Sequence, residues 1–330
     1  MVVTMSTDFG RKVRAVLAER GMTIRAAARA LNYDHAYLSR VLNGKQAPSP
    51  QLAESLDLLL SAGGALVELA AVLTSDDRDR ITYSLNHPSR VDGSTVAALG
   101  DVLTAQRRLD DAIGPHAMLP STLPQIGTVT RMLKEARGPH RDSLAEVVAE
   151  YVQFGGWLHA EARNDREAVT MLDDAENLAD EVGVGTLAAH ASSFRGWLAR
   201  QQGRPRGVAR WFSAAYHTPG AHPAQRMDDA AQAAQGLAVL GEREAARRLL
   251  GEAADLADAA WRQPHPRTAH WPLTETFQRL NMGLAHLSLQ EYREATEHIS
   301  AGLSGLPADQ RNAVWTAEYR QALEEAEERK

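Results

Sequence analysis

The residues whose types and spacing offer the clearest chemistry lie between His35 and Asn43. At 100° per residue, a helix over this segment points Leu38, Val41 and Leu42 in one direction. The opposite direction receives small, polar and basic side chains, namely His35, Ala36, Ser39, Arg40 and Asn43. A short helix with one apolar face and one such polar face fits the major groove of DNA, where arginine can donate two hydrogen bonds to guanine. The segment therefore predicts a DNA-reading helix.

Capping and turn residues on either side place this helix within a small bundle. Thr23 is suited to begin a helix over 24–30, and Asp34 is suited to begin the helix over 35–43. The turn between them, at Asn32 and Tyr33, is as short as a helix-turn-helix requires. Further signals extend the bundle over residues 8–73: Gly21 and Gly44 as helix ends, Pro50 as a helix start, and apolar faces at Val13, Val16, Leu17, Ala27, Ala28, Leu31, Leu52, Leu56 and Leu59.

The charge distribution agrees with a DNA-binding N-terminus. The chain of 330 residues has a net charge of −6. Residues 1–73 contain eight Lys or Arg and six Asp or Glu, which leaves the remainder at −8. Because phosphate attracts basic surfaces, the larger, acidic part is an unlikely surface for DNA.

The segment TIRAAARALNYDHAYLSRVLNGKQAPSP resembles the repressor-type helix-turn-helix of the XRE, or lambda-repressor-like, family. The resemblance covers about the first fifth of the chain. Its matching positions are Thr23, Ala28, Leu31, Asp34, Leu38-Ser39-Arg40-Val41, Asn43-Gly44-Lys45 and Pro48. One departure is Ile24, which stands where the family often has glutamine for a phosphate contact, so that Arg25 would have to supply it.

The resemblance assigns a role to each exposed position of this segment. It implies contacts with base edges from His35, Ala36 and Arg40. It implies contacts with phosphates or sugars from Thr23, Arg25, Tyr37, Ser39, Asn43 and Lys45.

Residues 74–94 are polar, charged and interrupted by Pro88 and Gly93, which predicts a linker with one short helix near 78–85. From residue 95 to 330 nearly every segment has helical periodicity. A pattern of small and apolar positions recurs around four expected loop positions, Arg163, Gly203, Gly241 and Gln290, which are 40, 38 and 49 residues apart. The fold class predicted for the chain is all-α: a helix-turn-helix bundle followed by an α-solenoid.

The recurrent pattern resembles the tetratricopeptide repeat, in which small residues let helical hairpins stack closely. Such stacks present a concave face, and by consensus position its residues would be Glu150, Gln153, Trp157, His190, Trp197, Asp228 and Gln235. This face suits a peptide, a small molecule or a protein segment. Packing of Trp157 and Trp197 between hairpins is the competing interpretation. We expect the charged segment 312–330 to cap the stack.

Several other chemistries are not indicated. The chain has no cysteine, and its histidine pairs, His217 with His222 and His265 with His270, lack the convergent partners that a metal site needs. Neither a phosphate-binding glycine loop nor a nucleophile elbow occurs, so we expect no cofactor and no enzymatic activity. The N-terminus has no secretory signal and no segment is apolar enough to span a membrane, which indicates a cytoplasmic protein.

Together these patterns predict a dimeric, sequence-specific transcription regulator that binds a double-stranded operator. The repeats would provide dimerisation, effector sensing or both, as in the plan of peptide-responsive quorum-sensing regulators, which the chain resembles. The alternative is a protein-interaction adaptor whose repeats bind a partner and whose DNA domain is auxiliary.

Overall fold

The computed structural model describes residues 10, 13–14, 16–18, 20–43, 48–60, 75–263, 274–307 and 310–330. In these residues every regular element is a helix, which confirms the all-α prediction. The contacts divide the chain into two compact units: Met1–Tyr83 with Ala97–Ala105, and Ser84–Val96 with Gln106–Lys330. None of the described helices is both long and apolar enough to cross a membrane.

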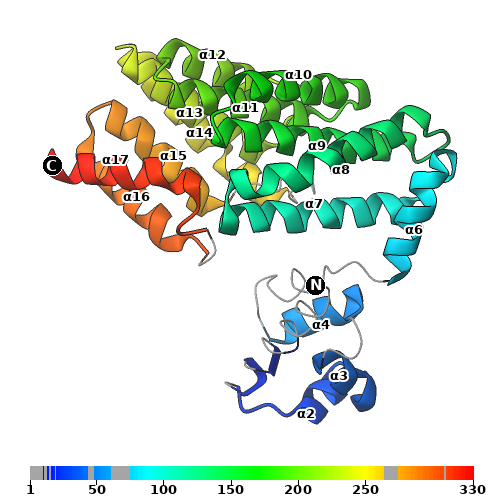
Figure 1. Ribbon diagram of the computed structural model, residues 1–330. Coiled ribbons are helices and arrows are strands. Elements are labelled where there is room, and N and C mark those ends of the chain that lie inside the picture. Colours follow the sequence, from blue (N-terminus) through cyan, green and yellow to red (C-terminus); the bar gives the residue numbers. More distant parts are fainter. Residues whose placement is uncertain are drawn as a thin grey trace. The chain divides into compact units, whose positions relative to one another are not determined.

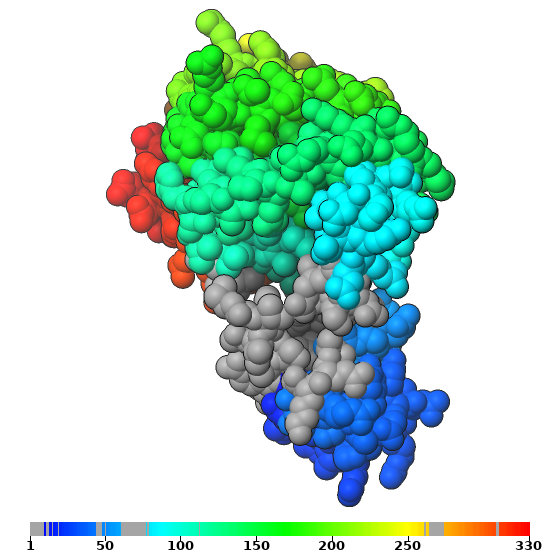
Figure 2. Space-filling model, turned by 45° about the vertical axis from the view of Figure 1, so that its right-hand side comes forward, coloured from blue at the N-terminus to red at the C-terminus, as the bar shows by residue number. Residues whose placement is uncertain are grey.

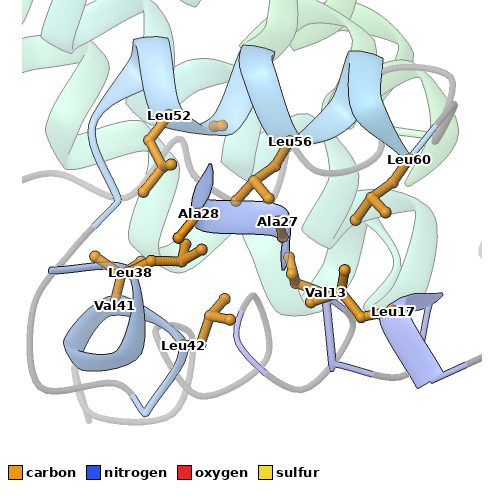
Figure 3. Packing of buried hydrophobic residues seen from close by; sticks show 11 residues of the cluster. Val13, Leu17, Ala27, Ala28, Leu38, Val41, Leu42, Leu52, Leu56 and Leu60 are labelled. Atoms are coloured by element: carbon orange, nitrogen blue, oxygen red, sulfur yellow. The ribbon is translucent and has the colours of Figure 1, made fainter. Parts of the chain in front are cut away.

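In the described residues of the first unit, three of the helices are arranged around one apolar cluster. They are α2 (Ile24–Ala30), α3 (His35–Leu42) and α4 (Pro50–Leu59), and residues 13–14 and 16–18 are also helical. Figure 3 shows leucines of α4 above the small residues of α2, with side chains of α3 and of the first helical segment completing the cluster. Its buried members are Val13, Leu17, Ala27, Ala28, Leu38, Val41, Leu42, Leu52, Ala53, Leu56 and Leu60.

A close backbone approach explains why a glycine stands at residue 10. A Cβ atom added to Gly10 would collide with the main-chain carbonyl of Leu42. Because backbone cannot move aside as a flexible side chain can, only glycine lets the N-terminal segment lie against the end of α3.

The predicted linker is largely helical. It contains α6 (Ser75–Asn86) and the 3₁₀ turn η1 (Pro88–Arg90), so that the short helix expected near 78–85 is present and longer. Asp92 then caps α7 (Gly93–Ile113) by accepting a hydrogen bond from the Thr95 amide. The domain boundaries at residues 73 and 94 stay predictions.

The second unit is a succession of helices, most of them paired as antiparallel hairpins (Figure 1). After α7 come α8 (Pro115–Glu135), α9 (Arg141–Glu161), α10 (Asp165–Val182), α11 (Gly185–Gln201), α12 (Pro205–Tyr216), α13 (Pro223–Val239), α14 (Arg243–Arg262), α15 (Glu275–Ser288), α16 (Tyr292–Gly305), η2 (Val314–Thr316) and α17 (Ala317–Glu328). The helices from α8 to α12 each contact the next along the chain, and their colours follow one another in the space-filling view (Figure 2). This stacking of consecutive helices is a helical solenoid.

Each of the four expected loop positions lies between the two helices of one hairpin. The hairpins are α9–α10, α11–α12, α13–α14 and α15–α16. All four adopt a left-handed backbone: Arg163 at φ 62°, Gly203 at 64°, Gly241 at 85° and Gln290 at 64°. The small or apolar residue five positions after each of them is buried, namely Ala168, Val208, Ala246 and Ala295. The repeat pattern in the sequence thus corresponds to one turn conformation and one packing position used four times.

The stretch GPHAMLPST, whose glycine and prolines are typical of a loop, is not a loop. Only Gly114 interrupts the helix, and α8 continues through Pro120 and Pro124. These prolines are four residues apart and exposed, while the opposite face of α8 buries Met118, Ile126 and other apolar residues. Because packing of that face outweighs the hydrogen bonds that proline removes, the helix continues.

Candidate nucleic-acid interface and ligand cavity

The exposed face of α3 is held in place by its cap and by its buried face. The Asp34 carboxylate accepts a hydrogen bond of 2.8 Å from the Tyr37 amide, which fixes the start of the helix. Leu38, Val41 and Leu42 are fully buried in the apolar cluster. The three residues expected at base edges, His35, Ala36 and Arg40, are all exposed.

A polar cluster at the end of α3 includes one residue that sequence reasoning missed. Arg14 donates a 2.7 Å hydrogen bond to Oδ1 of Asn43. The Asn43 amide in turn donates to the Ser39 carbonyl at 2.8 Å and lies 3.3 Å from its hydroxyl. Arg14 thus lies with Asn43 and Ser39, the two residues expected at phosphates. In the sequence, the only indication of this was that Arg14 directly follows Val13, a residue of the apolar face.

The remaining expected phosphate contacts begin α2 or flank α3. The Thr23 hydroxyl accepts a hydrogen bond of 3.1 Å from the Ala26 amide, which leaves its O–H able to donate. Arg25 is exposed beside it. Tyr37 is half-buried and stacks on Tyr33 with the ring centres 5.9 Å apart. Lys45 lies outside the described residues.

The turn between α2 and α3 is four residues long, Leu31 to Asp34, and Asn32 takes a left-handed φ of 57°. Ala28 is buried between the two helices. Ile24, the departure from the family pattern, is half-buried against the same cluster, so its apolar side chain serves packing. The arrangement is a helix-turn-helix with a solvent-facing second helix.

The second unit contains a cavity. The volume that the centre of a water-sized molecule can occupy in it is about 50 Å³. Its walls come from α9, α11, α12, α13, α15, η2 and α17: Trp157, His190, Ser193, Phe194, Trp197, Arg200, Phe212, Gln225, Asp228, Gln232, Phe277, Trp315, Glu318 and Tyr319. Four of the residues expected on the concave face, Trp157, His190, Trp197 and Asp228, lie on this wall.

The other three expected residues do not line the cavity. Glu150 pairs with Arg107 of α7 at 2.9 Å, with both side chains buried. Gln153 donates to the Leu187 carbonyl at 3.2 Å, within the junction of two hairpins. Gln235 accepts a 3.3 Å hydrogen bond from Arg200 behind the wall. These three side chains hold neighbouring helices together.

An ion pair in the wall of the cavity was not predicted. The Glu318 carboxylate on α17 accepts hydrogen bonds from Nε and Nη2 of Arg200, each 3.0 Å long. The same carboxylate accepts from Nε1 of Trp197 at 3.1 Å. The residues are more than a hundred positions apart in the sequence, so no local pattern could have indicated the contact.

Two adjacent carboxyl groups on α13 are buried beside the cavity. Burial raises the pKa of Asp228 to about 6, opposed by hydrogen bonds from Asn281 and Gln232 and by the charge of Arg200. Burial and the neighbouring Asp228 raise the pKa of Asp229 well above its ordinary range. Asp228 lies on the wall of the cavity, and Asp229 beside it favours its protonated form more strongly than Asp228 does.

A second carboxyl pair, Asp110 of α7 and Glu161 of α9, adjoins Trp157. Burial raises the pKa of Asp110 to about 7 and that of Glu161 to about 9. The charge of Asp111 also raises both values, and the hydrogen bond between the two groups raises the pKa of Glu161 and lowers that of Asp110, which favours one proton shared between them. Within the part of the chain that the structure describes, no three His, Asp or Glu side chains converge as metal ligands. That part includes His217 and His222, whereas His265 and His270 lie outside it.

Comparison with known proteins bears on the first unit only. Searches of curated proteins and of solved structures each found no match. Residues 8–70 match the sequence family described as "Helix-turn-helix domain", which spans the bundle whose geometry is given above. The N-terminal part of this chain is a helix-turn-helix domain.

Proposed function

We propose that the protein is a sequence-specific DNA-binding transcription regulator that acts as a dimer. The observation that carries the proposal is the exposed face of α3, where His35, Ala36 and Arg40 are presented by a helix capped at Asp34 and buried along its other side. Arginine on such a helix can discriminate guanine from other bases by about 1–3 kcal/mol. Arg14, Arg25 and Asn43 would hold the flanking phosphates.

In the proposed dimer, the two copies of α3 enter successive major grooves about 34–36 Å apart. The helical solenoid, similar in plan to tetratricopeptide repeats, would provide the dimer contact and sense an effector. An effector changes the affinity for the operator only if it binds more tightly to one arrangement of the two DNA-binding units than to another. In this proposal the protein is located in the cytoplasm with the genome. It uses no cofactor and catalyses no reaction.

Selection from a random duplex library tests this proposal. The purified full-length chain is incubated with the library, and the bound duplexes are sequenced over several rounds. A consensus of two half-sites about ten base pairs apart, centre to centre, is expected from a dimer. Binding that shows no consensus and only a steep dependence on salt would contradict the regulator and favour an adaptor with an auxiliary DNA domain.

A further inference from the structure

The chain's own C-terminal segment forms one side of the cavity. Besides the Glu318 contacts, the Tyr319 hydroxyl donates to Asn281 of α15 at 2.7 Å. Nε1 of Trp315 donates to Asp111 of α7 at 3.1 Å. Figure 1 shows α17 beside α15 and α16, and the ion pair with Arg200 extends its contacts to α11. An extended peptide that entered the cavity would have to displace this segment.

The space that remains suits a small molecule. About 50 Å³ accessible to a water-sized molecule has room for roughly three to five water molecules, and a compact organic molecule occupies a comparable space. The cavity is lined by helices from four hairpins and by the C-terminal segment.

Aromatic rings form much of the wall. The ring of Trp157 lies 4.8 Å from that of Trp197 and 4.9 Å from that of Phe194, measured between centres. On the C-terminal side, Trp315 and Tyr319 meet edge to face at 6.1 Å. The faces of aromatic rings carry negative potential, and enclosures of several rings bind organic cations.

The charges on the wall also favour a cation. Arg200 and Glu318 neutralise each other in their ion pair. Burial lowers the pKa of His190 to about 3, so this imidazole is neutral at physiological pH. Asp228 is then the unbalanced charge among the described wall residues, and it is negative.

Two buried polar atoms on the wall have no hydrogen-bond partner. Nε2 of Gln225 donates to Ser193 at 3.0 Å and to Asp229 at 2.9 Å, which fixes the amide and leaves Oε1 without a donor. Nδ1 of His190 is also unpartnered. The two side chains are 1% and 4% exposed. A buried atom left without its hydrogen bond costs about 1–3 kcal/mol, and a ligand with N–H donors would recover it.

We propose that this cavity binds a small organic cation that carries N–H donors, namely a primary ammonium on a short aliphatic or aromatic skeleton. The skeleton lies among Trp157, Phe194 and Trp197, and the ammonium group donates to Gln225 near Asp228. Regulation by this ligand rests on the proposed function, whereas the binding itself requires no DNA.

Binding is measured on the full-length chain without DNA, by calorimetry and by tryptophan fluorescence. The probes are methylammonium, isobutylammonium and benzylammonium chloride, each paired with the alcohol of the same skeleton. We expect at least one ammonium to bind about ten-fold more tightly than its alcohol, which corresponds to about 1.4 kcal/mol. If no ammonium binds more tightly than its alcohol, the proposal is wrong.

Variants locate the site. Asp228→Asn and Gln225→Leu are each expected to weaken ammonium binding about ten-fold, since each removes one favourable group. Asp180→Asn, at an exposed position of α10, is the matched control and should leave affinity unchanged. Circular dichroism identifies any variant that fails to fold, and the other variant then decides. Equal loss in the control, or no loss in either folded variant, would overturn the assignment.

The outcome is separable from that of the DNA experiment. Ammonium binding with no DNA consensus would keep the cavity assignment and refute the regulator. A DNA consensus with no preference for ammonium would refute the cavity assignment alone. Binding of an extended peptide by a chain that ignores all three ammonium probes would show that the C-terminal segment leaves the groove and would overturn the proposal.

Discussion

The tie between Glu318 and Arg200 gives a strong test of how the C-terminal segment is held. Replacing Glu318 with alanine removes the acceptor for hydrogen bonds from Trp197, Arg200 and Gln201. The Arg200 guanidinium, with its side chain 10% exposed, would then keep only the amide oxygens of Gln232 and Gln235.

The expected cost follows from this burial. Removing one partner of a buried ion pair costs about 3–5 kcal/mol, because the remaining charge stays desolvated. Since the Glu318 side chain is 18% exposed, water can partly replace it, and we expect a loss of about 2–4 kcal/mol. Glu318→Gln keeps the size and one acceptor oxygen, so its loss should be smaller, about 1–2 kcal/mol.

Urea denaturation followed by tryptophan fluorescence measures this loss. All six tryptophans lie at or after residue 157, so the signal reports the second unit alone. Glu325→Ala on the same helix is the matched control, because Glu325 forms only an exposed pair with Arg329. An exposed pair contributes about 0.2–1 kcal/mol. If Glu318→Ala costs no more than this control, the C-terminal segment is not held by the buried ion pair and the reasoning fails.

Three further predictions concern the solenoid. Gln290→Gly should raise the unfolding free energy by about 1 kcal/mol, because glycine adopts the left-handed φ of 64° without strain; an unchanged or lower urea midpoint would contradict this. Gly236→Ala should lower the unfolding free energy by about 1–3 kcal/mol, because the new Cβ would lie 2.5 Å from the Ala209 amide nitrogen. A urea midpoint within error of the wild-type value would contradict this and show that α12 and α13 can move apart at little cost. Raised pKa values of Asp110 and Glu161 mean that the native state binds more protons than the unfolded state above pH 4, so stability should fall as pH rises from 5 to 9. Glu161→Gln should make that decline shallower, and equally steep declines in thermal melts of the two proteins would refute the shared proton.

Local patterns predicted the first unit well. The N-caps Thr23 and Asp34, the turn at Asn32 and the bounds of α2 follow from residues within a few positions of one another. The same holds for the loop positions of the solenoid, where Arg163 and Gln290 take the backbone conformation of the glycines aligned with them. Such features are set by neighbouring atoms and are visible in sequence.

The cavity was only partly predictable. Of the seven residues expected on the first helices of the hairpins, Trp157, His190, Trp197 and Asp228 lie on its wall. Its closure by Glu318 depends on a contact 118 residues away from Arg200, which no periodicity encodes. The sequence predicted that segment 312–330 caps the stack. The side chains of Trp315, Glu318 and Tyr319 in this segment also form part of the cavity wall, which the sequence did not predict.

The continuation of α8 through Pro120 and Pro124 also required the structure. Proline signals a break only when the lost hydrogen bonds and ring clashes outweigh the burial of the remaining face. The apolar residues that decide this balance face other helices, so their contribution is not visible in the segment itself.

The most direct test of the central claim is the effect of Arg40→Ala on the recognition of single bases. Affinities are measured for the selected duplex and for duplexes with one substituted base pair, using the wild-type chain, Arg40→Ala and the phosphate-contact variant Arg25→Ala. We predict that Arg40→Ala loses about 1–3 kcal/mol and its preference at one base pair per half-site, whereas Arg25→Ala weakens all duplexes alike. An Arg40→Ala variant that retains the full preference at every base pair would contradict the assignment of α3 as the helix that reads DNA.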